Sequence, residues 1–354
     1  LLVLAASFCL SATAEATRVT GSEQYLGHIK YLASEKLKGR GTGMKELDTA
    51  ASYIAKQFKQ AGLKPVGGAN GDYMQKFSVT TRARVTGGNK IAYSIGGGEA
   101  RSKTLKSSRE FIPFNFSDNG QVTGPLVFAG YGITAKEYGY DDYEGLDVKD
   151  KIVLVLRQEP QEFDEKSKFE SKAYTAHSQL ANKSINARMH VAKGVILINT
   201  LFNKSSQVDN LDVFGRAAGP ANAGLLFAQM KAEEADPLFQ HAGKSLKEIC
   251  EGIDKDTTPR SFAFPADLKV SMNIEIERQS RVVSNVVGYL PGETNEYVVI
   301  GAHYDHLGMG EQFSLGTPGK PHLGADDNAS GTSALLELAR YFSKQPKRKR
   351  GVLF

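Results

Sequence analysis

The pattern of apolar and polar residues along the chain predicts an α/β protein. Apolar residues recur every three or four positions over Glu23–Ala33, Leu47–Ala61 and Thr332–Phe342, a spacing typical of helices. A further helix is expected within 178–192, and looser alternation over 74–93 predicts edge strands. Short apolar runs beside glycine or charged residues predict buried strands instead. These runs are residues 124–130, 151–156, 194–198, 282–290, 298–300 and 351–354.

The ends and faces of the first two helices can be predicted as well. Ser22 is expected to cap the first helix, with Leu26, Ile29 and Ala33 facing inward. Gly62 is expected to end the second helix, because glycine tolerates the left-handed backbone of a C-terminal cap. The Gly-rich segment 37–43 between them is interpreted as a turn. It lacks both a preceding strand and the Gly-Lys-Ser/Thr ending of a phosphate-binding loop.

The stretch Tyr297–Gly331 holds the residues best suited to chemistry. Its apolar run 298–300 ends in the sequence HYDH, which contains His303 and Asp305. Ligands of open α/β sheets bind at the carboxyl ends of such strands. The two residues are two positions apart, so on an extended chain their side chains leave the same face. A carboxylate beside an imidazole suits a metal site, because it fixes the imidazole tautomer and raises its basicity.

A second polar segment, GADDNASG at residues 324–331, places Asp326 and Asp327 just before the last predicted helix. A carboxylate there can bridge two divalent cations held about 3.5–4 Å apart. The same residues could serve only as a helix N-cap, and a single His-x-Asp is weak evidence by itself. The two segments together, one at a strand end and one at a helix start, favour a metal site.

The pair GAHYDHLG and GADDNASG closely resembles the co-catalytic zinc aminopeptidases of peptidase family M28. The resemblance implies an α/β fold with a mixed sheet flanked by helices, only part of which is present in this chain. It also implies His303 as a zinc ligand, Asp305 as the catalytic acid that orients it, and Asp326 as the bridge between two zinc ions. By the same resemblance, the Asp326–Asp327 peptide bond is expected to be cis.

A second module is expected inside the peptidase region. The order of strand, DDYEGLDVKDKIVLVLR, helix and GVILI resembles a protease-associated (PA) domain, an α+β insert common in that family. Its histidines, His177, His190 and His241, carry no ligand spacing and are interpreted as structural or solvated. Proteolytic cleavage is expected near 100–110 and 262–272. The predicted parts are a signal peptide at 1–16, the start of the peptidase domain at 17–105, the PA-like insert at 106–268, and the peptidase core at 269–354.

The first residues and the composition indicate where the protein acts and what it does not bind. Residues 1–10 are apolar but too short to span a bilayer, and small residues at 12, 14 and 16 follow, as in a secretory signal. We therefore expect a periplasmic or extracellular protein without a membrane span. Its 41% hydrophobic and 23% charged residues are ordinary for a folded globular protein. A net charge of +5 without interleaved aromatic residues gives no indication of nucleic-acid binding.

These features predict a zinc-dependent exopeptidase, an aminopeptidase that removes N-terminal residues from peptide substrates with a metal-activated water. In the resembling family, a strand like 351–354 runs on into a Glu-Glu pair that supplies the general base and a zinc ligand. A later Asp and His complete the site. Since catalytic zinc usually has about three protein ligands, we expect the chain by itself neither to bind two zinc ions tightly nor to hydrolyse peptides.

Three alternatives remain open from the sequence. They are a carboxypeptidase, a glutaminyl cyclase-like enzyme, and a non-catalytic peptide- or protein-binding module on the same scaffold. His306 and His322 lie near the predicted site along the chain, and loop roles are favoured for both. The oligomeric state is not set by the sequence.

Overall fold

The computed structural model describes residues 22–68, 71–96, 101–200, 209–217, 219, 222–311, 314–345 and 347–354. The predicted signal peptide, residues 1–16, lies outside these ranges. The chain forms two compact units. Unit 1 comprises Leu1–Thr81 and Ser280–Phe354, and unit 2 comprises Arg82–Gln279. No helix among the described residues is both long and apolar enough to cross a bilayer.

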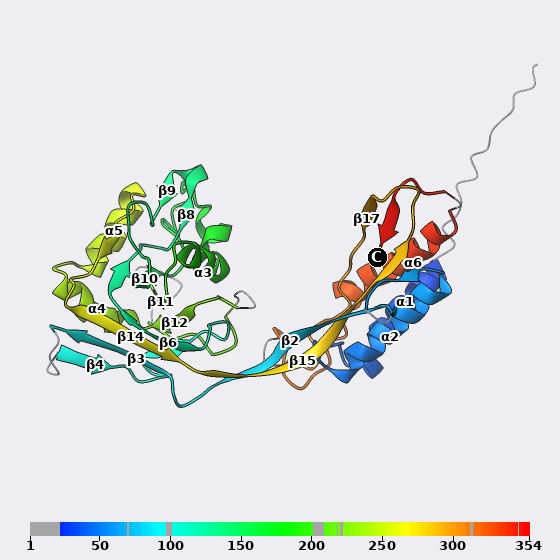
Figure 1. The fold of residues 1–354 in the computed structure, drawn as a ribbon, viewed down its shortest axis with the longest axis horizontal. Coiled ribbons are helices and arrows are strands. Elements are labelled where there is room, and N and C mark those ends of the chain that lie inside the picture. Colours follow the sequence, from blue (N-terminus) through cyan, green and yellow to red (C-terminus); the bar gives the residue numbers. More distant parts are fainter. Residues whose placement is uncertain are drawn as a thin grey trace, which may run out of the picture. The chain divides into compact units, whose positions relative to one another are not determined.

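Unit 1 combines a small mixed sheet with helices. The sheet has the strand order β1 (Lys64–Pro65), β16 (Gly288–Leu290), β18 (Gly351–Leu353) and β17 (Tyr297–Val299). β17 runs parallel to β18, whereas the other neighbours are antiparallel. Figure 1 shows α1 and α2 beside α6, and both contact it. The helical segments are α1 (Ser22–Leu32), η1 (Glu35–Leu37), α2 (Lys45–Gln60), the π-helical turn η6 (Ala325–Ser330) and α6 (Gly331–Ser343).

The three helices predicted for unit 1 are confirmed to within two residues at each end. Gly62 follows α2 with a φ of 75°, as expected of a C-terminal stop. The inward face predicted for α1 was wrong at Leu26, which is 49% exposed. The helix instead buries His28 and Leu32, because the His28 imidazole hydrogen-bonds the Tyr53 hydroxyl of α2. A histidine that hydrogen-bonds a partly buried tyrosine thus lies on the inward face, where leucine was expected.

Two of the predicted strands differ from the structure. The run 298–300 was expected to be buried, but all three residues of β17 are exposed. Among the described residues β17 has one strand neighbour, β18, so its apolar side chains are only partly covered. The run 282–290 is split into the end of β15 (Ile276–Val286) and β16. Strand 351–354 is confirmed as β18.

The core of unit 1 lies between the helices and this sheet. Its buried members come from α2, α6, β16 and β18, with Leu63 after α2 and Phe354 after β18. They are Ile54, Phe58, Leu63, Leu290, Leu335, Leu336, Ala339, Val352 and Phe354. Apolar burial of this kind contributes roughly 25 cal/mol per Å², so this cluster fixes α6 and the segments before it against the sheet.

Unit 2 is built on a six-stranded sheet whose inner strands are parallel. β7 (Leu126–Phe128), β10 (Ile152–Leu156), β11 (Gly194–Ile198) and β12 (Leu226–Met230) run parallel in that order. β13 (Phe262–Ala263) and β5 (Phe111–Pro113) pair antiparallel at the two edges. Every residue of β10, β11 and β12 is buried, as expected of parallel strands covered on both faces. The predicted runs 151–156 and 194–198 are therefore confirmed.

A second sheet of unit 2 has the order β4 (Ser102–Thr104), β3 (Lys90–Ile95), β14 (Leu268–Ile274) and β6 (Gly120–Gly124). The predicted insert boundaries at 106 and 268 fall inside unit 2, because β3, β4 and β14 pair in this sheet. The remaining elements are β8 (Thr134–Ala135), η3 (Lys136–Tyr138), β9 (Tyr140–Asp141), η4 (Ser171–Ala173), η5 (Ala176–Ser178), α3 (Leu180–Met189), α4 (Ala232–His241) and α5 (Leu246–Asp256).

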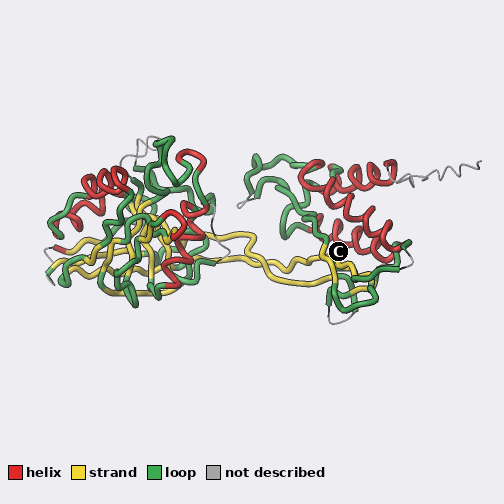
Figure 2. Tube along the Cα trace, turned by 90° about the horizontal axis from the view of Figure 1, so that it is seen from above, coloured by secondary structure: helices red, strands yellow, loops and turns green. Residues whose placement is uncertain are grey.

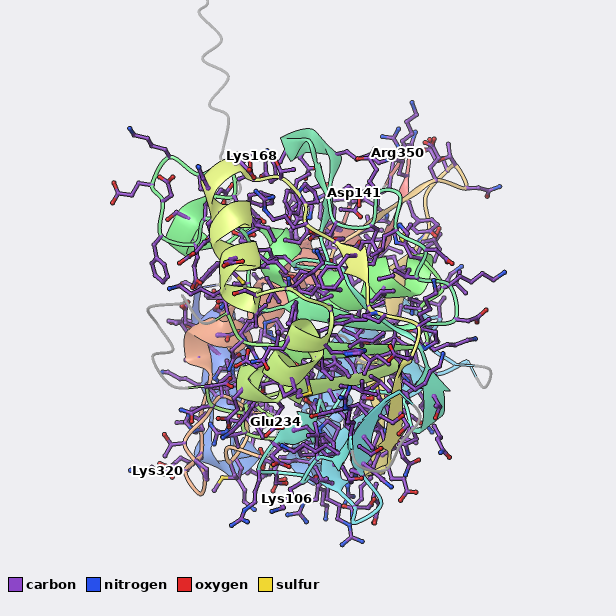
Figure 3. The ribbon with its side chains drawn as sticks, turned by 90° about the vertical axis from the view of Figure 1, so that its left-hand side faces the viewer. Lys106, Asp141, Lys168, Glu234, Lys320 and Arg350 are labelled. Atoms are coloured by element: carbon purple, nitrogen blue, oxygen red, sulfur yellow. The ribbon has the colours of Figure 1, made fainter. Side chains whose placement is uncertain are left out.

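Two long strands pass from one unit to the other. β2 (Met74–Val85) and β15 pair with each other, and Figure 2 shows them as adjacent yellow segments. Charged side chains such as those of Lys106 and Arg350 lie at the outside of the ribbon (Figure 3).

The α/β class predicted from the sequence is confirmed.

Candidate metal site

The backbone of His303 is held in place by the start of α6. After β17 the chain runs on to His303, whose carbonyl oxygen accepts two hydrogen bonds. One comes from the Thr332 hydroxyl at 2.9 Å and the other from the Asn328 side-chain amide at 3.2 Å. The core of unit 1 fixes α6, and these bonds fix His303 to α6. The histidine that the sequence singled out is therefore tied to the GADDNASG segment.

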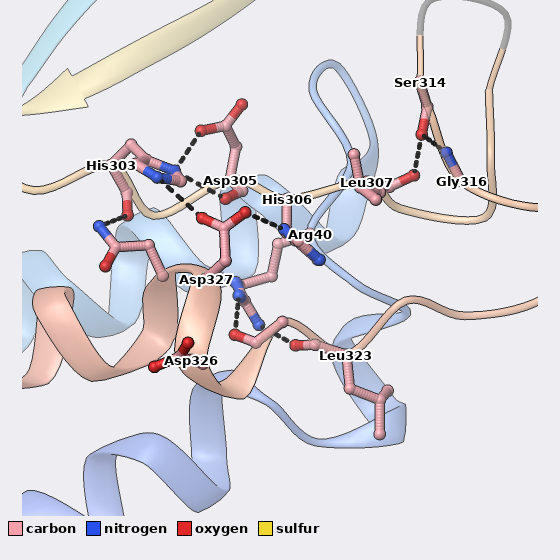
Figure 4. Close-up of polar contacts among 12 residues, drawn as sticks. Arg40, His303, Asp305, His306, Leu307, Ser314, Gly316, Leu323, Asp326 and Asp327 are labelled. Atoms are coloured by element: carbon pink, nitrogen blue, oxygen red, sulfur yellow. Dashed lines mark hydrogen bonds and ion pairs between the residues drawn. The ribbon is translucent and has the colours of Figure 1, made fainter.

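Two carboxylates flank the imidazole of His303, one at each ring nitrogen (Figure 4). Its Nδ1 lies 3.4 Å from Asp305 Oδ1 and 3.2 Å from the Asp305 carbonyl oxygen. Its Nε2 lies 3.1 Å from Asp327 Oδ1. An Nδ1–H that points at Asp305 leaves the Nε2 lone pair free to bind a metal. The structure thus brings His303 and Asp305 together, as the sequence predicted.

Asp327, and not its neighbour Asp326, faces His303. Figure 4 shows the Asp327 carboxylate directed at the imidazoles of His303 and His306, with Asp326 turned away from them. The backbone leaves helical geometry at Asp327 and Asn328. The cis peptide bond was predicted one position too early, since it joins Asp327 to Asn328. In this irregular turn, consecutive side chains do not follow helical spacing, so spacing along the chain could not distinguish the two aspartates.

His306 is a member of the site that sequence reasoning missed. Its Nδ1 lies 3.5 Å from Asp327 Oδ2, and its side chain is only 13% exposed. Burial lowers the pKa of His306, and the nearby Asp327 carboxylate opposes that shift. His322, by contrast, contacts the Thr317 carbonyl within its own loop. The extra histidine in HYDH was the available signal, but spacing alone did not separate His306 from a loop residue.

The Gly-rich turn 37–43 lies directly against the site. The Thr42 hydroxyl donates a hydrogen bond of 2.7 Å to Asp305 Oδ2. The fully buried Arg40 side chain donates hydrogen bonds to backbone carbonyl groups of both motif segments. Burial lowers the pKa of Arg40, opposed by the carboxylates of Asp305 and Asp327. A role for this turn at the site was not predicted.

A polar hollow of about 390 Å³ opens at this site. It is lined by Gly41, Thr42, Thr80, Thr81, His303, Asp305, His306, Leu307, Glu311, Ser314 and Asp327. A larger cavity of about 760 Å³ lies in unit 2, beside Arg157 and the start of α3. We place the candidate site at the smaller hollow, because it contains the imidazole and carboxylate groups that contact one another.

The imidazole and carboxylate groups at this hollow are of the types that bind zinc, but they are too few for a complete zinc site. Imidazole nitrogen and carboxylate oxygen are ordinary zinc ligands. The 3.1 Å between His303 Nε2 and Asp327 Oδ1 suits two ligands of one ion. Among the described residues, however, no group of three or more His, Cys, Asp or Glu side chains could hold a metal ion.

The other predicted structural histidines have partners elsewhere. His177 pairs with Glu137 at 2.6 Å, and His241 pairs with Asp267 at 2.9 Å. The His190 ring stacks on Tyr143. Each contact is within unit 2.

Comparison with known families agrees with the two resemblances. Residues 285–354 match peptidase family M28, and residues 122–230 match the PA domain. The first match contains both HYDH and GADDNASG, and the second lies inside unit 2. The chain therefore contains a segment that matches peptidase family M28 and, before it, a segment that matches the PA domain.

Curated relatives match over short stretches. Leucine aminopeptidase 1 of Trichoderma harzianum is 42% identical over 55 residues, which is 16% of this chain and 13% of that protein. BOS complex subunit NCLN of Homo sapiens is 48% identical over 61 residues, which is 17% of this chain and 9% of that protein. The chain thus spans only a small part of the curated relatives it matches.

Among solved structures, the chain is similar to an aminopeptidase from Aneurinibacillus sp. with a TM-score of 0.42 and 22% sequence identity. That alignment covers 94% of this chain and 61% of the other. A zinc aminopeptidase from Bacillus subtilis gives a TM-score of 0.34 at 19% identity. These scores are too low to add to the two family matches.

Proposed function

We propose that the protein containing this chain is a secreted, zinc-dependent aminopeptidase that hydrolyses N-terminal residues from peptides. The observation that carries the proposal is the contact between His303 and Asp327 within the region that matches family M28. The relatives named as aminopeptidases support cleavage at the N-terminal end of the peptide substrate rather than at its C-terminal end. The apolar residues 1–10, followed by small residues, support a periplasmic or extracellular location.

Three residues of the site have assigned tasks in this proposal. His303, through Nε2, and Asp327 would hold zinc, and Asp327 would take the role first given to Asp326, because its carboxylate is the one beside His303. Asp305 orients the His303 ring through Nδ1, which also raises the basicity of Nε2. Bound zinc supplies a Lewis acid for the scissile carbonyl and a water of lowered pKa. The polar hollow provides room for a peptide end beside these groups.

The chain by itself supplies too few ligands for a two-zinc centre. His303 and Asp327 provide one nitrogen and one carboxylate, whereas a catalytic zinc usually has about three protein ligands. We therefore propose that this chain, purified alone, does not retain two zinc ions and does not hydrolyse peptides. Two equivalents of zinc remaining after dialysis would contradict this.

The test uses the whole protein that contains this chain. We expect it to hydrolyse leucyl p-nitroanilide, to lose that activity with a chelator, and to regain it with zinc. A blocked acetyl-leucyl substrate serves as the control, since an aminopeptidase needs a free α-amino group. Activity that survives the chelator would refute the proposal, and cleavage of C-terminal residues instead would favour the carboxypeptidase alternative.

A non-catalytic binding protein is the second candidate. It is favoured by the match to a protein named as a complex subunit rather than an enzyme, and by the small number of ligands among the described residues. Binding of unblocked peptides by the whole protein, with no hydrolysis at any zinc concentration, would select it over the aminopeptidase.

A further inference from the structure

Arg40 is the largest fully buried side chain among the described residues, and it lies in the turn that contacts the site. Burying a guanidinium is costly unless its donors are hydrogen-bonded. Arg40 meets this requirement with backbone carbonyl groups rather than with a buried carboxylate partner. Its Nε donates to the Tyr304 carbonyl at 2.8 Å, and Nη1 also donates to the carbonyl of Leu32.

The remaining bonds of Arg40 reach the second motif segment. Nη1 donates to the Leu323 carbonyl at 2.8 Å, and Nη2 donates to the Gly324 carbonyl at 2.9 Å. One rigid guanidinium therefore spans the segment that carries His303 and Asp305 and the segment that carries Asp327 (Figure 4). The distance between these segments sets the contact between His303 and Asp327.

The backbone of the same turn binds the first segment again. The Arg40 carbonyl accepts a hydrogen bond from the His306 amide at 3.1 Å, and the Gly39 carbonyl accepts one from the Gly308 amide at 3.0 Å. The approach is so close that a Cβ on Gly39 would lie 2.2 Å from the His322 carbonyl oxygen. Thr42 adds the hydrogen bond to the Asp305 carboxylate described above.

We propose that the Arg40 turn, residues Leu37–Gly43, is a positioning element that holds His303, Asp305 and Asp327 in register. This inference rests on the proposed function. Arg40 fixes the backbones of the two motif segments, and Thr42 fixes the Asp305 carboxylate that orients His303. Arg40 acts through backbone carbonyl groups, and Thr42 acts through the Asp305 carboxylate. Lysine cannot replace Arg40, because three donors at one point cannot reach the carbonyl groups that the guanidinium fork reaches.

The test compares the Arg40→Lys and Thr42→Val variants with a control variant in which an arginine outside the site is replaced. Arg350→Ala is the control, because Arg350 is exposed and its side chain pairs with Glu296 at the surface of unit 1. The imidazole nitrogen signals of His303 and His306 are followed by NMR in the metal-free chain, with thermal unfolding to confirm the fold. The Asp327→Asn variant defines the signals of the broken contact.

We expect the His303 and His306 signals of Arg40→Lys to move toward those of Asp327→Asn, with Arg350→Ala unchanged. Thr42→Val is expected to move the His303 signal alone. In the whole protein, the apparent zinc dissociation constant should rise about 10- to 100-fold in both variants, as is usual when partners of metal ligands are lost.

A folded Arg40→Lys variant with the His303 and His306 signals of the parent would overturn the proposal. If Arg40→Lys does not fold, Thr42→Val decides, because its exposed hydroxyl can be removed without disturbing the core. Unchanged His303 signals in that variant would also overturn it. The NMR signals can be measured without zinc and without activity. The test of the Arg40 turn can therefore be carried out even if the proposed peptidase function is wrong, and the two failures can be told apart.

Discussion

At the scale of single residues, the site depends on which of two adjacent aspartates faces the imidazoles. Asp327 lies 3.1 Å from His303 Nε2 and 3.5 Å from His306 Nδ1. Asp326 is exposed, and its carbonyl accepts a hydrogen bond from the Ser330 hydroxyl. Both residues carry the same charge, so any difference between them comes from geometry.

The first prediction uses this pair as its own control. Asp327→Asn in the whole protein should weaken zinc binding by at least about tenfold, because the amide is a poorer ligand than the carboxylate. Asp326→Asn should leave the zinc dissociation constant within about twofold, since its side chain points elsewhere. Competition with a chelator measures both constants. A larger effect of Asp326→Asn would restore the assignment first made from the sequence.

The second prediction concerns a buried carboxylate of unit 2. Asp142 is fully buried and accepts hydrogen bonds from the amides of Tyr131 and Ile133 and from the Tyr140 hydroxyl. Burial raises the pKa of Asp142 to about 7. Asp142→Ala leaves three donors without an acceptor and should lower the free energy of unfolding by about 3–5 kcal/mol.

Urea unfolding of the chain checks this value. The matched control is Asp147→Ala, because the Asp147 side chain is 74% exposed and pairs with Lys151 at the surface. Such a pair contributes less than about 1 kcal/mol. Equal effects of the two substitutions would show that the buried hydrogen bonds of Asp142 do not stabilise the unit as argued.

At the scale of elements, the contact of α1 with α2 and α6 contains a histidine that should make unit 1 sensitive to acid. His28 Nδ1 lies 2.6 Å from the Tyr53 hydroxyl, and its Nε2 lies 3.6 Å from Glu337 Oε1. Arg340, one turn after Glu337, is the positive charge that acts on His28. Burial is the largest cause that lowers the pKa of His28 from 6.5, and the Glu337 carboxylate opposes it.

The sign of the pH dependence follows from this shift. As the pH falls through 6.5 the unfolded chain binds a proton that the folded chain resists, so the contribution of His28 to stability is full well above pH 6.5 and is lost as the pH is lowered. The unfolding temperature of unit 1 should therefore drop between about pH 7.5 and about pH 5.5. His28→Gln, which can still contact Tyr53, should reduce that drop. An unchanged pH profile in this variant would assign the acid sensitivity to other groups.

The helices were predicted more accurately than the burial of the strands, and the packing of these elements explains the difference. Helices α2 and α6 were predicted well because each presents a continuous apolar face to a core within its own unit. β17 carries the same kind of apolar run but has one described strand neighbour, so its residues are exposed. Local apolar content predicts that a segment forms a strand. Burial depends on which other segments lie against it.

At the scale of the whole molecule, the division into two compact units predicts two unfolding events. Each unit has its own core, and the predicted insert and the peptidase region fall mainly in different units. Scanning calorimetry of the chain should show two transitions. Asp142→Ala should move one of them and His28→Ala the other. One transition shifted by both substitutions would mean that the units unfold together.

The predicted sites of proteolysis also belong to this scale. Cleavage near 100–110 and 262–272 remains a prediction, but both ranges contain strands of unit 2, β4 in the first and β13 and part of β14 in the second. Hydrogen-bonded strands resist proteases, because cleavage needs an unfolded segment. The structure therefore gives no reason to expect cleavage at these places before others, and mass spectrometry of limited digests decides the question.

By itself the sequence determined the α/β class, the helices α1, α2 and α6, and the two segments that meet at the site. These features depend on local periodicity and on motifs whose residues are close together in the chain. The order of its motifs also led to the prediction of a PA-like module ahead of the M28-like segment, and both segments match those families.

Only the tertiary structure decided which side chains of these segments meet. It selected Asp327 over Asp326, because an irregular turn before α6 aims one carboxylate at His303. It added His306 to the site, and it brought Arg40 and Thr42 against residues more than 260 positions away in the chain. Contacts between such distant residues follow from the packing of whole elements, and no spacing along the chain encodes them.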